Sequence, residues 1–451
     1  MKVRFFIVVA NIVFVSATRL AAQPQFTVDS LIAQAVDNDY SIKVLEEELQ
    51  RSFLDMKLNK AARLPVISSN LWNESTNGRF YDPLSNQYTT SRTFVSSAGI
   101  SANWDVFNGG YTNIKTDADQ VAAEIRRLTL RQRKRDVAKE VVVLHADVMR
   151  SAAVKKILDE EIALYTVEVQ RLNELLLQKK ITFAELSSMI VNKQRIEEKK
   201  YTAEYEMDLN FYQLGLLTGK TLTIRSLSSA DSSYLPELPQ DAFLLAVRDS
   251  AALKQLSTNY GIKELQTKRA ALNTDLRASD ARMKIRIGAG VYSGYSTNRV
   301  VYNSETNLTE QAPLLTQLRD NTYQAVTVNF FLPLFDHRNR IGVRQAAADE
   351  RIARLQRDDV ERKIVFKYEM ARKELNIRHK RFETTQRQLA NEQAIFTSFQ
   401  ERFNAERLVK RYLFLARQRL LEAKVDYWNS YFDLYKTMRM FAIEYVDQTG
   451  F

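Results

Sequence analysis

The chain has 451 residues, a formal net charge of +11, 12 glycines, 7 prolines and no cysteine. Basic and acidic side chains are mixed within charged stretches such as 195–200 and form no basic blocks, which argues against nucleic acid as a partner. Without cysteine, disulfides and thiolate metal sites are excluded, so stability must come from packing or oligomerisation. The scarcity of glycine and proline predicts a chain dominated by long helices.

The first 22 residues predict a secretory signal peptide. Lys2 and Arg4 precede an apolar run over residues 5–17, and the small residues Ala21 and Ala22 follow it. This run is shorter than the about 20 apolar residues that a membrane-spanning helix needs, and no later stretch approaches that length. An amino-terminal membrane anchor is the alternative interpretation. We expect the chain to leave the cytoplasm.

The remainder of the sequence contains one structural unit twice. Phe107 has its counterpart in Phe335, about 228 positions later, and Ile181 has Leu408 at nearly the same offset. The segment between the copies contains Pro236 and is expected to be a linker. The predicted domains are a signal peptide over 1–22, a first repeat over 23–220, a linker or equatorial segment over 221–240 and a second repeat over 241–451.

Helical periodicity dominates both repeats. Residues 28–62 and 241–281 each predict a helix at the start of a repeat. Residues 112–179 and 341–408 predict helices of about 68 residues, roughly 100 Å long, which no small domain can bury. The return helix over 183–218 is shorter than the long helix over 112–179, and the difference is about the length of the first helix of the repeat. We therefore expect two short helices to flank each long one in the wall of a helical barrel.

Four segments alternate apolar and polar residues with the period of a β-strand, over 66–72, 93–105, 283–293 and 323–332. Each pair of strands is separated by a polar stretch that we predict to be a loop, over 73–92 and 297–322. The apolar set is predicted to face lipid and comprises Phe94, Ala98, Ile100, Ala102, Trp104, Met283, Ile285, Ile287, Val326, Val328 and Phe330.

Trp72 and Trp104 are both expected in an aromatic belt at the membrane interface, near the strand ends that adjoin the helices. Ordinary packing at a strand–helix junction is the alternative for each tryptophan.

Four strands are too few to close a barrel, and unpaired strand edges are not tolerated in lipid. Several copies must therefore pool their strands if the sheet crosses a membrane. A soluble protein with a small four-stranded sheet on a coiled coil is the competing interpretation.

The order of these features resembles the TolC-like family of outer-membrane efflux and secretion channels. The similarity is carried by Phe-Asn-Gly-Gly at 107–110, Leu-Pro-Leu-Phe-Asp at 332–336, the segment 415–423 and their arrangement in a repeat. The resemblance implies a mainly α fold with a transmembrane β-barrel: a homotrimer with a periplasmic α-helical tunnel and a shared barrel of about twelve strands. It also implies an outer-membrane location and a passive exit duct opened by a periplasmic adaptor bound to an inner-membrane pump.

The resemblance places the adaptor at the tips of the helical hairpins and the narrowest pore just before the second tip. The tip residues are Lys179, Lys180, Thr182, Glu406, Arg407 and Lys410. The pore candidates are Phe396, Gln400, Phe403 and Asn404. The family commonly has a glycine at the tip. Glu406 and Arg407 occupy the place where it is expected in the second copy, and Lys180 occupies it in the first. Solvated hairpin residues and interhelical packing are the respective alternatives.

No set of residues suggests an enzyme, a cofactor or a metal site. His145, His337 and His379 are interpreted as isolated, with no second histidine or carboxylate at ligand spacing. The competing functional class is a periplasmic structural or adaptor-type coiled-coil protein. Such a protein would carry a lipoyl-like or barrel domain between its helical arms, and none is visible in the sequence.

Overall fold

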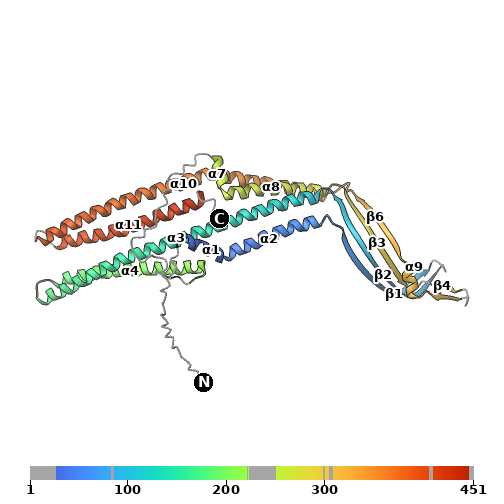
Figure 1. Ribbon diagram of the computed structural model, residues 1–451, viewed down its shortest axis with the longest axis horizontal. Helices are drawn as coiled ribbons and strands as arrows, with labels where there is room; N and C mark the ends of the chain where they lie inside the picture. The colour runs from blue at the N-terminus through green and yellow to red at the C-terminus, as the bar shows by residue number, and fades with distance from the viewer. Residues whose placement is uncertain are drawn as a thin grey trace, which may run out of the picture. The chain divides into compact units, whose positions relative to one another are not determined.

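A computed structural model describes residues 27–82, 86–220, 222, 250–297, 300–303, 308–405 and 410–445. The predicted signal peptide lies outside these residues, as does the predicted linker apart from Leu222. The described part of the chain is mainly helical with a smaller sheet, as the sequence predicts (Figure 1). No helix in these ranges combines the length and the apolar character needed to cross a membrane.

The long helices and their return helices occur in the predicted order in both halves. The single helix predicted over 28–62 is divided into two, and so is the described part of the one predicted over 241–281. In the first half the helices are α1 (Val28–Asn38), α2 (Tyr40–Ala61), α3 (Tyr111–Leu177) and α4 (Phe183–Thr218). In the second half they are α7 (Ser250–Leu256), α8 (Thr258–Ser279), α9 (Leu314–Asp320), α10 (His337–Asn404) and α11 (Lys410–Tyr445).

The long helices α3 and α10 contain 67 and 68 residues, and α4 and α11 contain 36 each. The predicted long helices and return helix are therefore confirmed.

The chain folds as two compact units that do not coincide with the two sequence repeats. Among the described residues, one unit contains 27–40, 134–222 and 369–445, and the other contains 41–133 and 250–368. We call them the hairpin unit and the sheet unit. Each draws on both repeats, because α3 and α10 contribute residues to both units.

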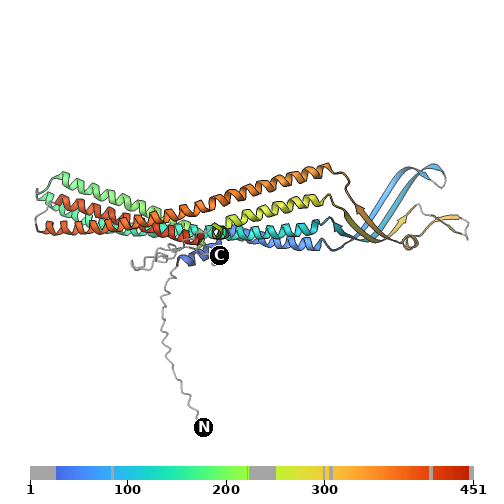
Figure 2. The same cartoon turned by 90° about the horizontal axis from the view of Figure 1, so that it is seen from above.

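In the hairpin unit, the second half of α3 is flanked by α4 and α11. Lys200 of α4 lies 2.7 Å from Asp159 of α3, and Arg417 of α11 lies 2.5 Å from Glu161 of α3. The carboxyl ends of α3 and α10 lie at the same end of this unit (Figure 2). A buried apolar cluster joins α3, α4 and α11 and contains Leu158, Tyr165, Leu172, Leu186, Met189, Ile196 and Leu421.

Helix α10 pairs with α11 in the same unit, where Arg378 lies 3.0 Å from Asp433. Helix α1 contacts α4 through Asn38, whose Nδ2 donates to the carbonyl of Leu217 at 3.1 Å. Gly219 ends α4 with a left-handed φ of 67°, and a Cβ there would lie 2.8 Å from Asn38 Oδ1. Only glycine fits both the backbone conformation and this close approach.

In the sheet unit, α2 lies beside the first half of α3, and α8 lies beside the first half of α10. Arg63, just after α2, donates from Nη2 to Asn113 Oδ1 of α3 at 2.8 Å. Lys263 of α8 donates to Gln356 Oε1 of α10 at 3.1 Å. Each long helix is thus flanked within this unit by a short helix.

Four antiparallel strands form the main sheet, in the order β1-β2-β3-β6 (Figure 1). They are β1 (Val66–Asp82), β2 (Gln87–Asn108), β3 (Lys284–Ser296) and β6 (Tyr323–Phe331). The prediction of a loop over 73–92 is wrong, because β1 and β2 stay paired to Asp82 and Gln87. Alternation of apolar and polar residues marks only the half-buried part of the two strands. Beyond that part, backbone hydrogen bonds still pair them.

The predicted loop over 297–322 is also not simply a loop. It contains the short paired strands β4 (Val300–Asn303) and β5 (Leu308–Gln311), followed by α9. These elements are four to seven residues long, too short for the periodicity of the sequence to reveal.

Candidate membrane face and hairpin tip

The strand register places the predicted apolar residues on one face of the sheet. Ala102 lies opposite Ala289 of β3, and Ala289 lies opposite Val326 of β6. Residues directly opposite each other in an antiparallel pair point to the same side of a sheet. The same register aligns Trp104 with Ile287 and Val328. We call this side the apolar face. Met283 lies just before the first residue of β3.

Large apolar side chains on this face are exposed in the single chain. Ile100 at the centre of β2 is 61% exposed, and Val326 of β6 is 75% exposed. Exposed apolar area of this extent marks a surface that meets a partner or a membrane. The apolar face therefore requires a contact that a single chain does not supply.

Aromatic residues occur at both ends of the apolar face. Trp104 stands at the end near the helices, and its Nε1 donates to the carbonyl of Arg63 at 2.8 Å. Phe94 and Tyr295 stand at the far end with their ring centroids 6.4 Å apart. Trp104 is ten positions after Phe94 along β2, which is about 33 Å along the strand and about 25 Å across a membrane at the usual tilt. This spacing equals the height of the apolar band in outer-membrane barrels.

Along β2 and β3, the opposite face carries mainly small and polar residues. Ser101 lies opposite Gly290, and Asp105 lies opposite Arg286, whose Nε lies 2.6 Å from Asp105 Oδ1. Trp72 lies opposite Ser97, on this second side. The prediction that both tryptophans belong to one belt is therefore wrong for Trp72. The register that decides its side depends on how β1 pairs with β2, which the strand's own sequence does not reveal.

The first hairpin tip is a tight turn without glycine. The backbone N–H of Lys180 donates to the carbonyl of Leu175 and that of Lys179 to the carbonyl of Leu176, both at 2.9 Å. Lys179 has a left-handed φ of 56°. This is the Schellman end of a helix, with lysine where glycine is usual. Thr182 then caps α4, and its hydroxyl accepts from the N–H of Glu185 at 3.3 Å.

The tip presents cationic and apolar side chains together. Lys179, Lys180 and Thr182 are exposed, and so are Leu177 at 84% and Phe183 at 71%. The sequence prediction placed the first tip over 179–183 and named its polar residues as the docking set, so it missed Leu177 and gave Phe183 no role. Glu406 and Arg407 of the second tip lie outside the described residues, and Lys410 is the first residue of α11.

The four pore candidates lie on the last three turns of α10. Phe396 and Phe403 are half-buried, whereas Gln400 and Asn404 are exposed. Phe396, Gln400 and Phe403 fall on one side of the helix because of their spacing. Their direction toward a pore stays a prediction.

No protein-family model and no curated protein matches the sequence. Solved structures do match. The outer membrane channel CmeC of Campylobacter jejuni has a TM-score of 0.77 at 12% identity, over 94% of this chain and 87% of that chain. The outer membrane protein VceC of Vibrio cholerae has a TM-score of 0.71 at 12% identity, over 92% and 95%. The open-state MtrE channel of Neisseria gonorrhoeae has a TM-score of 0.62 at 13% identity, over 92% and 89%.

The chain has the TolC-like outer-membrane channel fold. At the level of the fold, this confirms the resemblance seen in the sequence. The structures with this fold are described as channels or membrane proteins rather than as enzymes.

Within this channel fold, the histidines are dispersed. His145 is buried on α3, and its pKa is lowered to about 4 by burial and by the nearby Arg439. His379 lies 3.7 Å from Glu383, one turn further along α10, so the prediction that it has no carboxylate at ligand spacing is wrong. One carboxylate and one imidazole do not form a metal site. Within the described ranges, no three metal-binding side chains gather.

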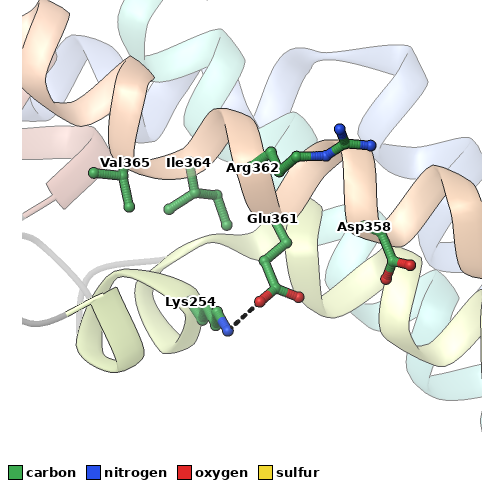
Figure 3. Close-up of a pocket in the computed structure, with 6 residues that line it drawn as sticks. All are labelled: Lys254, Asp358, Glu361, Arg362, Ile364 and Val365. Carbon is green, nitrogen blue, oxygen red and sulfur yellow. Dashed lines mark hydrogen bonds and ion pairs between the residues drawn. The ribbon is translucent and has the colours of Figure 1, made fainter.

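A shallow groove lies between α7 and α10 in the sheet unit. Figure 3 shows its lining residues, which are Lys254, Asp358, Glu361, Arg362, Ile364 and Val365. Lys254 pairs with Glu361 across the groove, and this hydrogen bond raises the pKa of the lysine. Among the charged groups drawn there, Lys254 and Glu361 join the two helices, and this contact suggests structural pairing rather than a catalytic set.

Proposed function

We propose that the chain is one protomer of a homotrimeric outer-membrane channel. The channel would serve as the exit duct of a tripartite efflux pump or a type I secretion system and carry out no chemistry itself. The observation that carries this proposal is the exposed apolar face, about as tall as the lipid core and bounded by aromatic residues at both ends.

The strand order also supports a shared barrel. Strands β1 and β6 are the outer strands of the four-stranded sheet, so each has one edge without a partner among the described strands. Such edges cannot remain open in lipid, where each unpaired backbone group costs several kcal/mol. Pairing of β6 in one copy with β1 in the next removes the edges. Three copies would then give a barrel of about twelve strands, a size that leaves an aqueous lumen.

A stripe on α4 supports contact between copies at the helical level. Its buried residues, such as Ala203 and Met207, pack toward the neighbouring helices of the hairpin unit. The opposite side of α4 exposes large side chains at spacings of three and four, namely Tyr201, Tyr205, Leu209, Tyr212 and Leu216. A neighbouring protomer would cover this stripe, because a helix that is apolar on both sides is normally buried.

For the hairpin tip, we propose docking of a periplasmic adaptor that is linked to an inner-membrane pump. The exposed Leu177 and Phe183 offer apolar anchors, and Lys179 and Lys180 favour an acidic partner surface. Replacing Lys180 by Glu should reduce export while trimers remain. Lys199→Glu makes the same charge change on an exposed position of α4 away from the tip and should leave export unchanged. Equal export in the two variants would contradict docking here.

For the closed end of the tunnel, we propose that Phe396, Gln400 and Phe403 form apolar and amide rings near the threefold axis. A constriction of this kind closes by dewetting and needs no charge. Asn404 would stand at its lower rim. The alternative, that the two phenylalanines pack between helices, predicts that their removal lowers stability and leaves the conductance unchanged.

Reconstitution tests the proposed function. The purified chain should migrate with the mass of three copies and produce single-channel currents in planar bilayers. Joint replacement of Phe396, Gln400 and Phe403 by Ala should raise the conductance. A protein that stays monomeric in membranes and produces no current would contradict the channel. It would favour the periplasmic coiled-coil alternative, which leaves the apolar face without a role.

A further inference from the structure

Helix α9 is attached to the end of β3 by side chains. The N–H of Ser296 donates to Gln317 Oε1 at 3.0 Å, and Gln317 Nε2 donates to the carbonyl of Ala312 at 2.8 Å. Asn321 Nδ2 donates to the carbonyl of Gly294 at 2.7 Å, and the hydroxyl of Ser293 donates to the carbonyl of Leu318. These bonds give partners to backbone groups at the end of β3, beyond the residues that pair with β6, and they hold α9 in a fixed place.

Helix α9 lies on the side of the sheet that carries the apolar face. Ser293 lies opposite Ala98, and both belong to the row that continues Ile100 and Ala102. The aromatic pair of Phe94 and Tyr295 lies at the same end of the sheet. Helix α9 therefore adjoins the far boundary of the apolar face, at the opposite end from Trp104.

Helix α9 exposes two of its three leucines and buries an amide. Gln317 is 1% exposed, whereas Leu315 is 78% exposed and Leu314 is 51% exposed. Leu318 is half-buried, and the charged residues Arg319 and Asp320 are exposed. Leucines on the open side and a bonded amide on the inner side are unfavourable in water, because burial of apolar surface is what stabilises a short surface helix. The exposed leucines become favourable where the open side meets the acyl boundary of a bilayer.

We propose that α9 is an interfacial helix that binds the lipid surface at the far edge of the barrel, with Leu314 and Leu315 inserted below the headgroups. This inference rests on the proposed function, since it needs the apolar face to lie in lipid. Arg319, which is 81% exposed in its side chain and paired with Asp320 at 3.0 Å, then stands at headgroup level. The proposed binding partner of α9 is a phospholipid or glycolipid bilayer. The reason is that the exposed side of α9 adjoins the apolar face, which lies in the same bilayer under the proposed function.

The simpler role for α9 is to cover the edge of β3 without touching lipid. Covering the edge requires only the bonds of Gln317 and Asn321, and it places no demand on the side that carries the leucines. Contact of the leucines with acyl chains is therefore the property that separates the two roles.

Single-cysteine variants test the inference, because the chain has no native cysteine. Leu315→Cys, Asp320→Cys, Ile100→Cys and Ser101→Cys are each labelled with a small fluorophore and reconstituted in vesicles with brominated phospholipid. Asp320 is the matched control on α9, and Ser101 is the matched control on β2. We expect strong quenching at Ile100 and Leu315 and weak quenching at Ser101 and Asp320.

Strong quenching at Ile100 with no more at Leu315 than at Asp320 would overturn the lipid-binding helix and leave the channel intact. Weak quenching at Ile100 would overturn the membrane face itself, and the inference with it. Leu314→Cys repeats the test if the Leu315 variant does not assemble.

Discussion

The apolar residues of the hairpin unit and of the sheet unit meet opposite surroundings. Leu158 of α3 is 1% exposed within a cluster built from three helices, whereas Ile100 of β2 is 61% exposed in the centre of a sheet. The helices of the hairpin unit build a buried core within one chain, and ion pairs such as that of Arg417 with Glu161 link neighbouring helices. The strands leave both their apolar side and their outer edges uncovered. The strands therefore depend on surroundings outside the single chain to cover their apolar side, whereas the helices bury one side within the chain and leave only stripes such as that of α4 for a neighbouring copy.

The largest effect is expected on the apolar face. Replacing Ile100 by Arg should destabilise the assembled protein by about 2–4 kcal/mol, because the charge would lie near the midplane of the bilayer. Ser101→Arg places the same residue one position along β2 on the opposite side and should be tolerated. Trimer yield on semi-native gels, followed by unfolding in phospholipid vesicles, measures both variants. Equal losses would show that the two faces share one environment.

A smaller effect is expected in the hairpin unit at His145, whose pKa is lowered from 6.5 to about 4, chiefly by burial. The folded protein excludes the proton that the unfolded chain binds, so stability is full above pH 6.5 and is lost as pH falls toward 4. We expect a loss of about 2 kcal/mol between pH 7 and pH 5. Urea unfolding followed by circular dichroism measures it, with His145→Gln as the control that removes this dependence. A pH response that survives in the control would assign it to other groups.

The smallest effect is expected at the hairpin tip. Lys179 holds a left-handed φ of 56°, which costs a non-glycine residue about 1–2 kcal/mol. Lys179→Gly should raise stability by about 0.5–1 kcal/mol, since the added freedom of the unfolded chain offsets part of the gain. Gln178→Gly, one residue earlier and outside the left-handed region, should lower stability instead. Differential scanning calorimetry compares the two, and a gain in both would contradict the argument from backbone conformation.

The sequence predicts most of the helical architecture because long amphipathic helices repeat their pattern many times. The ends of α4 at Phe183 and Thr218 coincide with the predicted ones. The prediction fails where tertiary pairing decides the structure. The extension of β1 and β2 beyond the apolar band, the side occupied by Trp72 and the short helix α9 all depend on a partner strand.

The first hairpin tip is another place where the sequence alone does not predict the backbone conformation. The left-handed residue of the turn is Lys179, as its hydrogen bonds require, whereas the family pattern places the expected glycine one residue later, at Lys180. The apolar set on β2, β3 and β6 was predictable because its period of two is strong, and the structure adds the register that unites it. The direction of the pore candidates depends on neighbouring copies and stays a prediction.

In the proposed channel, the edge of β6 in one copy pairs with the edge of β1 in the next. Ser69 of β1 and Gln324, Val326 or Val328 of β6 lie on the apolar side, so a cysteine at Ser69 can be combined with one at each β6 position in turn. In adjacent strands such cysteines come within disulfide distance. Oxidation in membranes should give, for one pairing, a ladder that ends at three covalently linked copies. The absence of intermolecular links in every folded variant, or a ladder that continues beyond three copies, would contradict the closed trimeric barrel.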